Sequence, residues 1–472
     1  MKEKYRKIVN AIMKRPDYQW LLSIWAILIL AWIPAYLALF PGTFGYDAPI
    51  QLSYITGERP LSSHHPVMHT WMIGFFLKLG EVVGDSMNIG VAFYTLTQAL
   101  VATFGIAWSI LYTKKKNVSL ELIVIEIFFA ALNPALQILT FSVTKDIIFG
   151  AFLLMFTTSL CEWFNCETCN KKKHSLKEMA TVGISGTMMC LLRNQGIYIL
   201  MAIIIIYVLF RIQQKRLLLT LLIVFMVSEA FFGSFTYWFK SEKGDIREMF
   251  SVPAQQLARV YYMQKAYDKG QISQEQMEQL EKLIPEEALM SYTDRTADPV
   301  RSVFRTQVFL EEPEKYTWLY FEVGLQNPKI YWQAFWKLNE PYWNISENDY
   351  RRLSMTNIYG EYSETYGIRQ NSLNESYRLR LLDVIDNKYE QEIPVISWIL
   401  EPGFGIWIMV LIIIMAIYNR DKKKIMVLSP IILYFLTMIL GPVALMRYVY
   451  PITLATPLML GMFYDEIKHA RR

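Results

Sequence analysis

The sequence is poor in charged residues and in cysteine, and each shortage excludes a class of protein. Only 19% of its 472 residues are charged, whereas ordinary soluble domains have about 25%. Its 53% of hydrophobic residues excludes an intrinsically disordered chain, because such chains combine low hydrophobicity with high net charge. Four cysteines are too few for a disulfide scaffold of this length. The net charge of +5 is too small to indicate nucleic-acid binding.

Two further features are missing from the sequence. It contains neither the phosphate-binding motif GxxxxGKS/T nor the dinucleotide-binding motif GxGxxG. We therefore do not expect the chain by itself to be an ATP-driven pump. No repeat relates its two halves, and such repeats are typical of secondary transporters.

What the sequence does contain is a series of long apolar runs. Several reach about 20 residues, the length that crosses a hydrocarbon core ~30 Å thick. The first follows a basic segment and is longer than the core of a signal peptide, so we expect a retained helix. The runs predict an all-α polytopic membrane protein with about ten transmembrane helices, at 21–40, 88–112, 119–139, 146–163, 178–192, 197–210, 217–238, 397–418, 425–441 and 443–462.

The basic residues between the runs predict the orientation of the chain. Cytoplasmic loops of membrane proteins are enriched in Lys and Arg. The basic segments all fall on one side only if residues 67–84 do not cross the membrane, and we expect this stretch to be a helix in the outer interface. The prediction is a multi-pass cell-membrane protein with both termini in the cytoplasm. Its basic segments are Lys114–Lys116, Lys171–Lys173 with Lys177, Arg211 with Lys215 and Arg216, Arg420 with Lys422–Lys424, and Lys468 with Arg471 and Arg472.

The charge pattern also predicts three parts of the chain. Residues 240–395 hold 19 Lys+Arg and 25 Asp+Glu, whereas the rest of the chain has a net charge of +11. We therefore predict an N-terminal membrane domain at 1–238, with an outer loop at 41–87. A soluble extracytoplasmic insert follows at 239–396, and C-terminal membrane helices occupy 397–472.

The insert is predicted to be mostly helical, at 251–259, 274–289 and 327–338. The last of these helices places Tyr331 and Leu338 on one face and Trp332 and Trp336 on a neighbouring face. Such a helix packs against the core of its own domain, or it rests on the outer leaflet, where Trp and Tyr are favoured.

Asp47 is the first candidate functional residue. It follows the first predicted helix directly, with Phe44, Tyr46 and Pro49 close in sequence. One interpretation is a carboxylate that caps a helix in a loop. The other is a general base, because a carboxylate half-desolvated beside aromatic rings can have a raised pKa and take a proton from a hydroxyl.

A histidine cluster follows in the same outer loop, with His64, His65 and His69 in close succession. His65 and His69 have the i, i+4 spacing of one helix face, and with Asp47 they are a possible metal-ligand set. Hydrogen bonding to anionic oxygens is the interpretation we favour over a metal.

The cysteines offer a second possible metal site. Cys161, Cys166, Cys169 and His174 have a spacing compatible with zinc in a cytoplasmic loop, although free reduced thiols are the favoured interpretation. We expect Cys190 to be a core residue.

Three cations lie at the outer ends of predicted spans. They are Lys145, Arg193 and Arg447, and statistics for membrane proteins disfavour basic residues on the outer side. Arginine binds phosphate through a bidentate fork and lysine binds it as a point charge. The three residues therefore predict a site for an anion at the outer membrane interface. Their neighbours Asp146, Gln195 and Tyr448 are further candidates.

These motifs together resemble the GT-C class of membrane glycosyltransferases, which includes protein O-mannosyltransferases. The closest likeness is to an uncharacterised bacterial family of that clan. The resemblance covers most of the chain and rests on the order and sidedness of its motifs. They are Phe40-Pro-Gly-Thr-Phe-Gly-Tyr-Asp47 with Gln51, Ser63-His-His-Pro-Val-Met-His-Thr70, Thr144-Lys-Asp146, Arg193-Asn-Gln-Gly196, Ser251-Val-Pro-Ala-Gln-Gln-Leu-Ala-Arg259 and Gly441-Pro-Val-Ala-Leu-Met-Arg-Tyr448.

The resemblance implies a GT-C-like fold and transfer of a hexose or pentose from a polyprenyl-phosphate carrier to an extracytoplasmic acceptor. It implies Asp47 as the catalytic base, a second acidic residue at Asp146, and Arg193 and Arg447 as ligands of the carrier phosphate. No cofactor is implied, and a divalent metal stays an alternative. The partners would be the lipid-linked sugar, membrane lipid and an unidentified acceptor in the cell envelope, without nucleic acid.

The sequence departs from the class at two points, and other functions stay open. Asp47 stands alone in the first loop, where many members pair two acidic residues. The insert sits between the seventh and eighth spans and lacks the pattern of a β-trefoil. A transporter or flippase of lipid-linked sugars, or a non-catalytic envelope assembly protein, would share the same spans.

Overall fold

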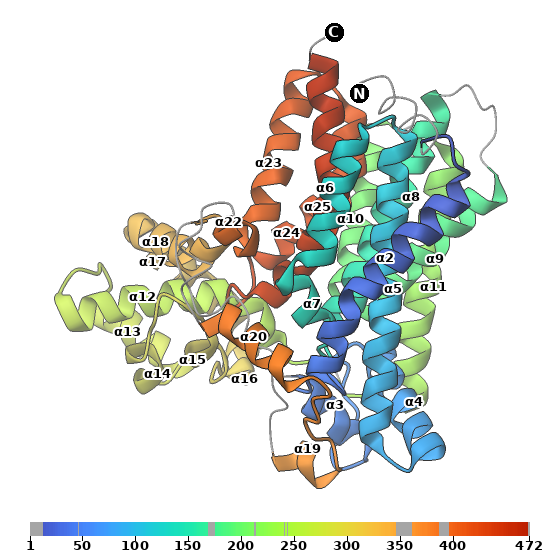
Figure 1. The fold of residues 1–472 in the computed structure, drawn as a ribbon. Helices are drawn as coiled ribbons and strands as arrows, with labels where there is room; N and C mark the ends of the chain where they lie inside the picture. The colour runs from blue at the N-terminus through green and yellow to red at the C-terminus, as the bar shows by residue number, and fades with distance from the viewer. Residues whose placement is uncertain are drawn as a thin grey trace. The chain divides into compact units, whose positions relative to one another are not determined.

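The computed structural model describes residues 13–45, 47–168, 175–211, 214–239, 241–242, 244–345, 361–386 and 396–470 (Figure 1). Within these residues the fold is helical, and the extended pairings are isolated bridges without a strand. The contacts divide the chain into two units. Unit 1 takes Met1–Glu242, Asn348–Tyr434 and Met446–Arg472, and unit 2 takes Lys243–Glu347 and Phe435–Leu445.

Each of the ten apolar runs is helical, which confirms the all-helical prediction. The run at 119–139 is two helices, because Asn133 and Pro134 interrupt it. The helices are α2 (Asp17–Leu39), α5 (Met87–Lys115), α6 (Leu120–Leu132), α7 (Pro134–Thr140), α8 (Lys145–Thr168), α9 (Leu176–Leu192), α10 (Gln195–Leu209), α11 (Lys215–Phe239), α23 (Gly403–Tyr418), α24 (Lys422–Met438) and α25 (Met446–Ala470).

Several of these helices are suited to a membrane. Among the described residues, α2, α5, α8 over Lys145–Asn165 and α11 are long and apolar enough to cross one. The pair α6 and α7 is a fifth candidate, bent by 48°. The bend has a local cause, because the Asn133 side chain accepts hydrogen bonds from the first backbone amides of α7 and Pro134 suits a first helical position. Helices α10 and α23 are apolar but shorter.

Helix α8 is the centre of unit 1. Its apolar segment is 89% buried, whereas those of α2 and α11 are 28% buried. Helices α5, α9 and α25 pack around it. A polar side chain at the start of α8 is therefore surrounded by protein, so each such group needs an ionic or hydrogen-bond partner.

Basic residues from two of the loops lie at one end of the unit 1 bundle. Lys114 at the end of α5 pairs with Asp17 at the start of α2, and Lys115 pairs with Glu162 near the end of α8. Near the end of α25, Asp465 pairs with Lys424. Figure 1 shows the end of α25 and the start of α2 at the end of the bundle away from α3 and α4. Lys114, Lys115 and Lys424 thus lie at the same end of the bundle, which agrees with the expected sidedness for these residues.

The opposite end of the bundle carries two shorter helices from the first outer loop. They are α3 (Asp47–Ile55) and α4 (Val67–Gly84), so the predicted helix at 67–84 is confirmed. Helix α4 runs closely against α5, and a Cβ on Gly80 would lie 2.1 Å from the Gly90 nitrogen. Helices α19 (Glu361–Thr365) and α20 (Glu375–Asp386) also belong to unit 1, although the charge pattern groups their residues with the insert. Helix α22 (Ile396–Leu400), at the start of the predicted C-terminal membrane helices, belongs to unit 1 as well.

A short bridge joins the first outer loop to the segment before α8. The Thr43 amide donates to Phe141 O at 2.8 Å, and the Val143 amide donates to Thr43 O at 2.9 Å. The Gln98 side chain from α5 also holds the second segment, through Thr140 O and Ser142 O. This bridge brings the residues that follow Thr43 beside the start of α8.

Unit 2 is built from short helices around its own apolar core. They are η1 (Ile246–Phe250), α12 (Ser251–Tyr267), α13 (Gln274–Leu283), α14 (Glu286–Met290), α15 (Asp298–Arg301), α16 (Thr306–Glu311), α17 (Pro313–Gln326), α18 (Pro328–Asn339) and η2 (Glu340–Tyr342). The predicted helices at 251–259 and 327–338 are confirmed, whereas 274–289 is two helices, α13 and α14, separated at Ile284 and Pro285. On α18, Tyr331 and Leu338 are buried in the unit, whereas 59% of Trp332 and 42% of Trp336 are exposed.

Gly42 provides a test of the bridge. Its φ is +129°, and an added Cβ would lie 2.5 Å from Thr95 Cγ2 and 2.9 Å from Phe141 O. Gly42→Ala should therefore lose about 1–3 kcal/mol to backbone strain and a further ~1–3 kcal/mol to overpacking. Gly57→Ala is the matched control, because Gly57 has φ +79° and open space around it. Thermal unfolding in detergent should give the larger loss for Gly42→Ala, and equal losses would contradict the packing argument.

Candidate functional site

Three charged side chains from distant parts of the sequence meet in unit 1. The Lys145 Nζ donates a hydrogen bond to Asp47 Oδ2 at 2.9 Å, and Arg447 Nη1 lies 3.8 Å from the same oxygen. Asp47 is the first residue of α3, Lys145 is the first of α8, and Arg447 is the second of α25. The side chains are 20%, 17% and 10% exposed, so the cluster is sheltered but reachable from solvent.

The electrostatics of this cluster hold Asp47 as an anion. Burial alone would raise the pKa of its carboxyl, but the charges of Lys145 and Arg447 outweigh burial and bring that pKa well below its usual range. The sequence-based interpretation as a base expected the opposite direction, because the two cations could not be paired with Asp47 from the sequence. In this state Asp47 is a weak base, and it becomes a stronger one when another anion competes for Lys145 and Arg447.

His65 completes this cluster. Its Nδ1 lies 3.3 Å from Lys145 Nζ, so the lysine donates and the imidazole proton is assigned to Nε2. Burial, with the nearby Lys145 charge, lowers the pKa of His65 to about 3, so the ring is neutral at ordinary pH. Nε2 is buried, and among the described residues it has no hydrogen-bond partner. A buried N–H of this kind is available to a ligand oxygen.

Arg193 and Asp146 form a second, fully enclosed ion pair. Arg193 Nη1 donates to Asp146 Oδ1, and the two side chains are 8% and 0% exposed. The Nε of Arg193 donates to Gln195 Oε1, and the guanidinium lies over the rings of Phe149 and Tyr434. Arg193 is therefore not a third open cation, because its charge is neutralised by Asp146, the residue after Lys145.

Tyr448 touches both ion clusters. The guanidinium carbons of Arg447 and Arg193 lie 4.7 and 5.6 Å from its ring centroid. Its hydroxyl accepts from Arg447 Nη2 at 2.7 Å, and its carbonyl accepts from the Tyr434 hydroxyl at 2.6 Å. The ring of Tyr448 thus contacts both arginines.

His69 and His64 occupy different positions from His65. The His69 Nδ1 lies 3.0 Å from Gln51 Oε1 and its Nε2 lies 2.8 Å from the Tyr94 hydroxyl, so both ring nitrogens are engaged. His64 is exposed, with its ring 4.7 Å from that of His65. The structure brings Asp47, His65, Lys145 and Arg447 together, and it places His69 in a buried network that supports α4.

The side chains of the site do not match the ligand group of a metal ion. In the part of the chain that the structure describes, no three His, Cys, Asp or Glu side chains come together as a ligand group. The Lys145 ammonium lies between Asp47 and His65, in the place that a cation would take. For the possible zinc site, the Cys166 side chain, Cys169 and His174 lie outside the described residues, and Cys161 and Cys190 are buried free cysteines.

Sequence reasoning missed the residues that position the site. Asn194 donates to Ser63 O at 3.1 Å and so holds the loop that carries His65. Tyr434 sits inside an apolar run of α24 and gives no polar signal in the sequence. Gln51 and Asn194 belong to motifs that the sequence analysis names. Their closeness in sequence to the histidines and to Arg193 could have indicated that they position the site.

The fold and the site define an all-helical protein with several helices suited to a membrane and a cluster of charged residues beside them. The model of a family of unknown function, DUF6020, matches residues 54–472, and the chain belongs to that family. The match includes Lys145, Arg193 and Arg447, whereas Asp47 precedes it. No curated protein and no solved structure matches the chain.

The two ion clusters should respond differently to mutation. Arg193→Gln leaves Asp146 buried without its charge partner, which should cost about 3–5 kcal/mol of stability. Lys145→Gln removes a partly exposed pair and should cost less than about 1 kcal/mol. The double variant Arg193→Gln/Asp146→Asn should recover part of the loss, because no lone charge remains buried. Thermal unfolding in detergent measures all three, and similar losses for the two single variants would contradict this division.

Proposed function

We propose that this protein is a multi-pass membrane glycosyltransferase that moves a sugar from a polyprenyl-phosphate carrier to an extracytoplasmic acceptor. The observation that carries the proposal is the contact of Asp47 with Lys145 and Arg447. It combines a carboxylate, which can take the proton of an acceptor hydroxyl, with two cations that can hold a departing phosphate. The buried Nε2 of His65 adds a neutral hydrogen-bond donor to the same cluster.

The charge balance of the cluster fits a phosphodiester donor. Lys145 and Arg447 contribute two positive charges and Asp47 one negative charge, while Arg193 and Asp146 cancel each other. These three side chains together carry a single positive charge, which the one negative charge of a polyprenyl-phosphate sugar would balance. By drawing on the two cations, the donor phosphate also raises the pKa of Asp47 from its depressed value and makes it a better base.

The transfer step then conserves charge. The acceptor hydroxyl gives its proton to Asp47, and its oxygen forms a bond to the anomeric carbon as the bond from that carbon to the phosphate oxygen breaks. The leaving polyprenyl phosphate takes the electron pair and gains a second negative charge, while Asp47 becomes neutral. Lys145 and Arg447 face two negative charges in total before and after the step. A single displacement of this kind inverts the anomeric centre.

The proposal includes a GT-C-like arrangement of about ten membrane spans, to which α9, α10, α23, α24 and α25 would contribute along with the longer helices. The end of the bundle with Lys114, Lys115 and Lys424 would face the cytoplasm, as the distribution of basic residues in membrane proteins favours. Helix α4 would lie in the outer interface, and both termini would be cytoplasmic.

The orientation can be tested by labelling single cysteines in a variant that lacks the four native ones. We choose Lys78, whose side chain is 75% exposed, Ser302 in unit 2, and Lys115 at the basic end of the bundle. On intact cells an impermeant thiol reagent should label Lys78→Cys and Ser302→Cys but not Lys115→Cys. Labelling of Lys115→Cys from outside would overturn the orientation and the extracytoplasmic site with it. Permeabilised cells are the control, because all three positions should then react.

The catalytic role of Asp47 can be separated from donor binding. Asp47→Asn keeps the size of the side chain but cannot take a proton at neutral pH, so transfer should fall about 10²–10⁴-fold. Donor binding should persist or strengthen, since Lys145 and Arg447 lose a competing anion. Arg447→Ala should instead weaken donor binding, by about 1.5–3 kcal/mol for a charge-assisted hydrogen bond.

Both quantities are measured on the same purified variants, with polyprenyl-phosphate sugar as the ligand. Near-normal transfer by Asp47→Asn would remove it as the base. Loss of donor binding along with transfer, in a protein of normal thermal stability, would make Asp47 part of the binding site rather than the base. A transporter or flippase would show no sugar transfer in any variant, including the unmodified chain.

A further inference from the structure

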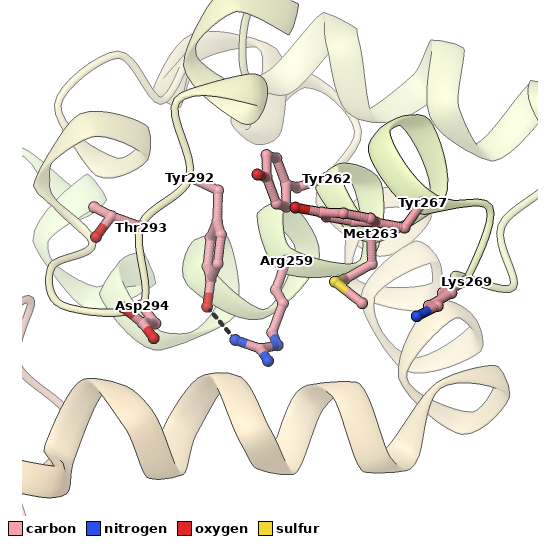
Figure 2. A pocket seen from close by; sticks show the side chains of 8 residues that line it. All are labelled: Arg259, Tyr262, Met263, Tyr267, Lys269, Tyr292, Thr293 and Asp294. Carbon is pink, nitrogen blue, oxygen red and sulfur yellow. Dashed lines mark hydrogen bonds between the residues drawn. The ribbon is translucent and has the colours of Figure 1, made fainter.

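Unit 2 contains a pocket that the proposed transfer chemistry does not use. It is open to solvent and has a volume of about 540 Å³, within the ~300–1,000 Å³ of small-molecule sites. Its wall comes from the second half of α12, the loop after that helix and the segment between α14 and α15. The residues that line it are Arg259, Tyr262, Met263, Tyr267, Lys269, Tyr292, Thr293 and Asp294, all shown in Figure 2.

Arg259 is the central cation of this pocket. Its Nη1 donates to the Tyr292 hydroxyl at 2.8 Å and its Nη2 donates to Gln333 Oε1 at 3.4 Å, so both acceptors are neutral. Its Nε is buried and has no hydrogen-bond partner among the described residues. The guanidinium thus keeps a positive charge that no carboxylate in the described chain neutralises, which favours an anionic ligand.

The neighbouring charges strengthen this preference. Lys269 adds a second cation on the side of Tyr267, and Asp294 adds one carboxylate on the side of Thr293, as Figure 2 shows. The lining therefore has a net positive charge. Burial raises the pKa of Tyr292, although Arg259 opposes the rise, so its hydroxyl keeps a proton that it can donate. Asp294 can accept from hydroxyl groups at the other end of a ligand.

Three tyrosine rings give the pocket a continuous aromatic wall. The ring of Tyr262 lies 5.8 Å from both Tyr267 and Tyr292, measured between centroids. Met263 is the only aliphatic side chain in the lining, so a hydrocarbon ligand would find little complementary surface. A ring with an apolar C–H face and hydroxyl groups at its edge would contact the tyrosine faces and also satisfy the polar groups around them.

We infer that this pocket binds a saccharide with an anionic group, either a carboxylate or a phosphate, with the anion on Arg259 and Lys269 and a sugar ring against the tyrosines. The naming of a saccharide rests on the proposed function, with a glycan of the cell envelope taken as the extracytoplasmic acceptor. The affinity for an anion rests only on the pocket. Under the proposed function the ligand is the acceptor or its growing end. The pocket would bind neutral sugars more weakly than acidic ones.

The inference is tested by direct binding to the full chain in lipid nanodiscs, without donor, by titration calorimetry. The probes are a glucuronate-containing tetrasaccharide, the same tetrasaccharide with its carboxylates converted to amides, and glucose 6-phosphate beside glucose. Each acidic probe should bind at least about tenfold more tightly than its neutral counterpart. Of the two acidic probes, the one with the larger advantage over its neutral counterpart identifies the anion as a carboxylate or a phosphate.

Variants of the pocket locate the effect. Arg259→Gln should abolish the preference for acidic over neutral probes, and Arg259→Lys should restore part of it as a point charge without the fork. Lys269→Gln, at an exposed position, should weaken acidic binding about two- to fivefold. Lys315→Gln is the matched control, because that lysine lies on α17, outside the pocket, and pairs with Glu312. It should leave binding unchanged.

Several results would overturn the inference. They are equal binding of acidic and neutral probes, an unchanged preference in Arg259→Gln of normal thermal stability, or tighter binding of uridine monophosphate than of any sugar acid. Asp47→Asn should bind the acidic probe normally. The Arg259 variants therefore test ligand binding in the pocket, and the Asp47 variant tests the proposed sugar transfer, so the two proposals can fail independently.

Discussion

The structure of the proposed site depends on the ion contact that Asp47 makes with Lys145 and Arg447. These residues begin three different helices, and the contact joins the first outer loop to the central helix α8 and to α25. Backbone hydrogen bonds support it, because the bridge of Thr43 with Phe141 and Val143 holds the two segments side by side. The loop is therefore attached to the helix bundle both by neutral hydrogen bonds and by the contact of its carboxylate with the cations.

A difference in burial gives the two neighbouring ion clusters different roles. Arg193 and Asp146 are enclosed by aromatic rings, and a pair of this kind fixes geometry but cannot exchange partners at low cost. Asp47 and Lys145 keep a fifth of their surface open, so an incoming anion can replace one of their contacts. The rigid pair contacts Tyr448, which also holds Arg447, and so positions a cation of the open cluster.

The sequence predicted the longer helices of unit 1 well because each has a long apolar run. From the basic loops it also predicted a common side for Asp47, Lys145, Arg193 and Arg447. It could not predict their pairing. Arg193 was grouped with Lys145 and Arg447 by its place in the chain, but adjacent positions at the start of α8 point Lys145 to Asp47 and Asp146 to Arg193. The same limit reversed the expected direction of the Asp47 pKa, which is set by cations distant in sequence. Tyr434 has no sequence signal, since a tyrosine within an apolar helix is ordinary.

The positions of the cations within their helices are themselves an argument for an anionic ligand. Lys145 and Arg447 occupy the first turns of α8 and α25, where the positive end of the helix dipole disfavours a cation by about 0.3–1 kcal/mol. Asp47 contacts both cations, and its negative charge offsets part of the repulsion between them and the helix ends. Helix N-termini of this kind bind phosphate through free backbone amides. An anion at this point would meet two side-chain cations and two helix termini, so a bound phosphate would relieve the repulsion between each cation and the end of its helix.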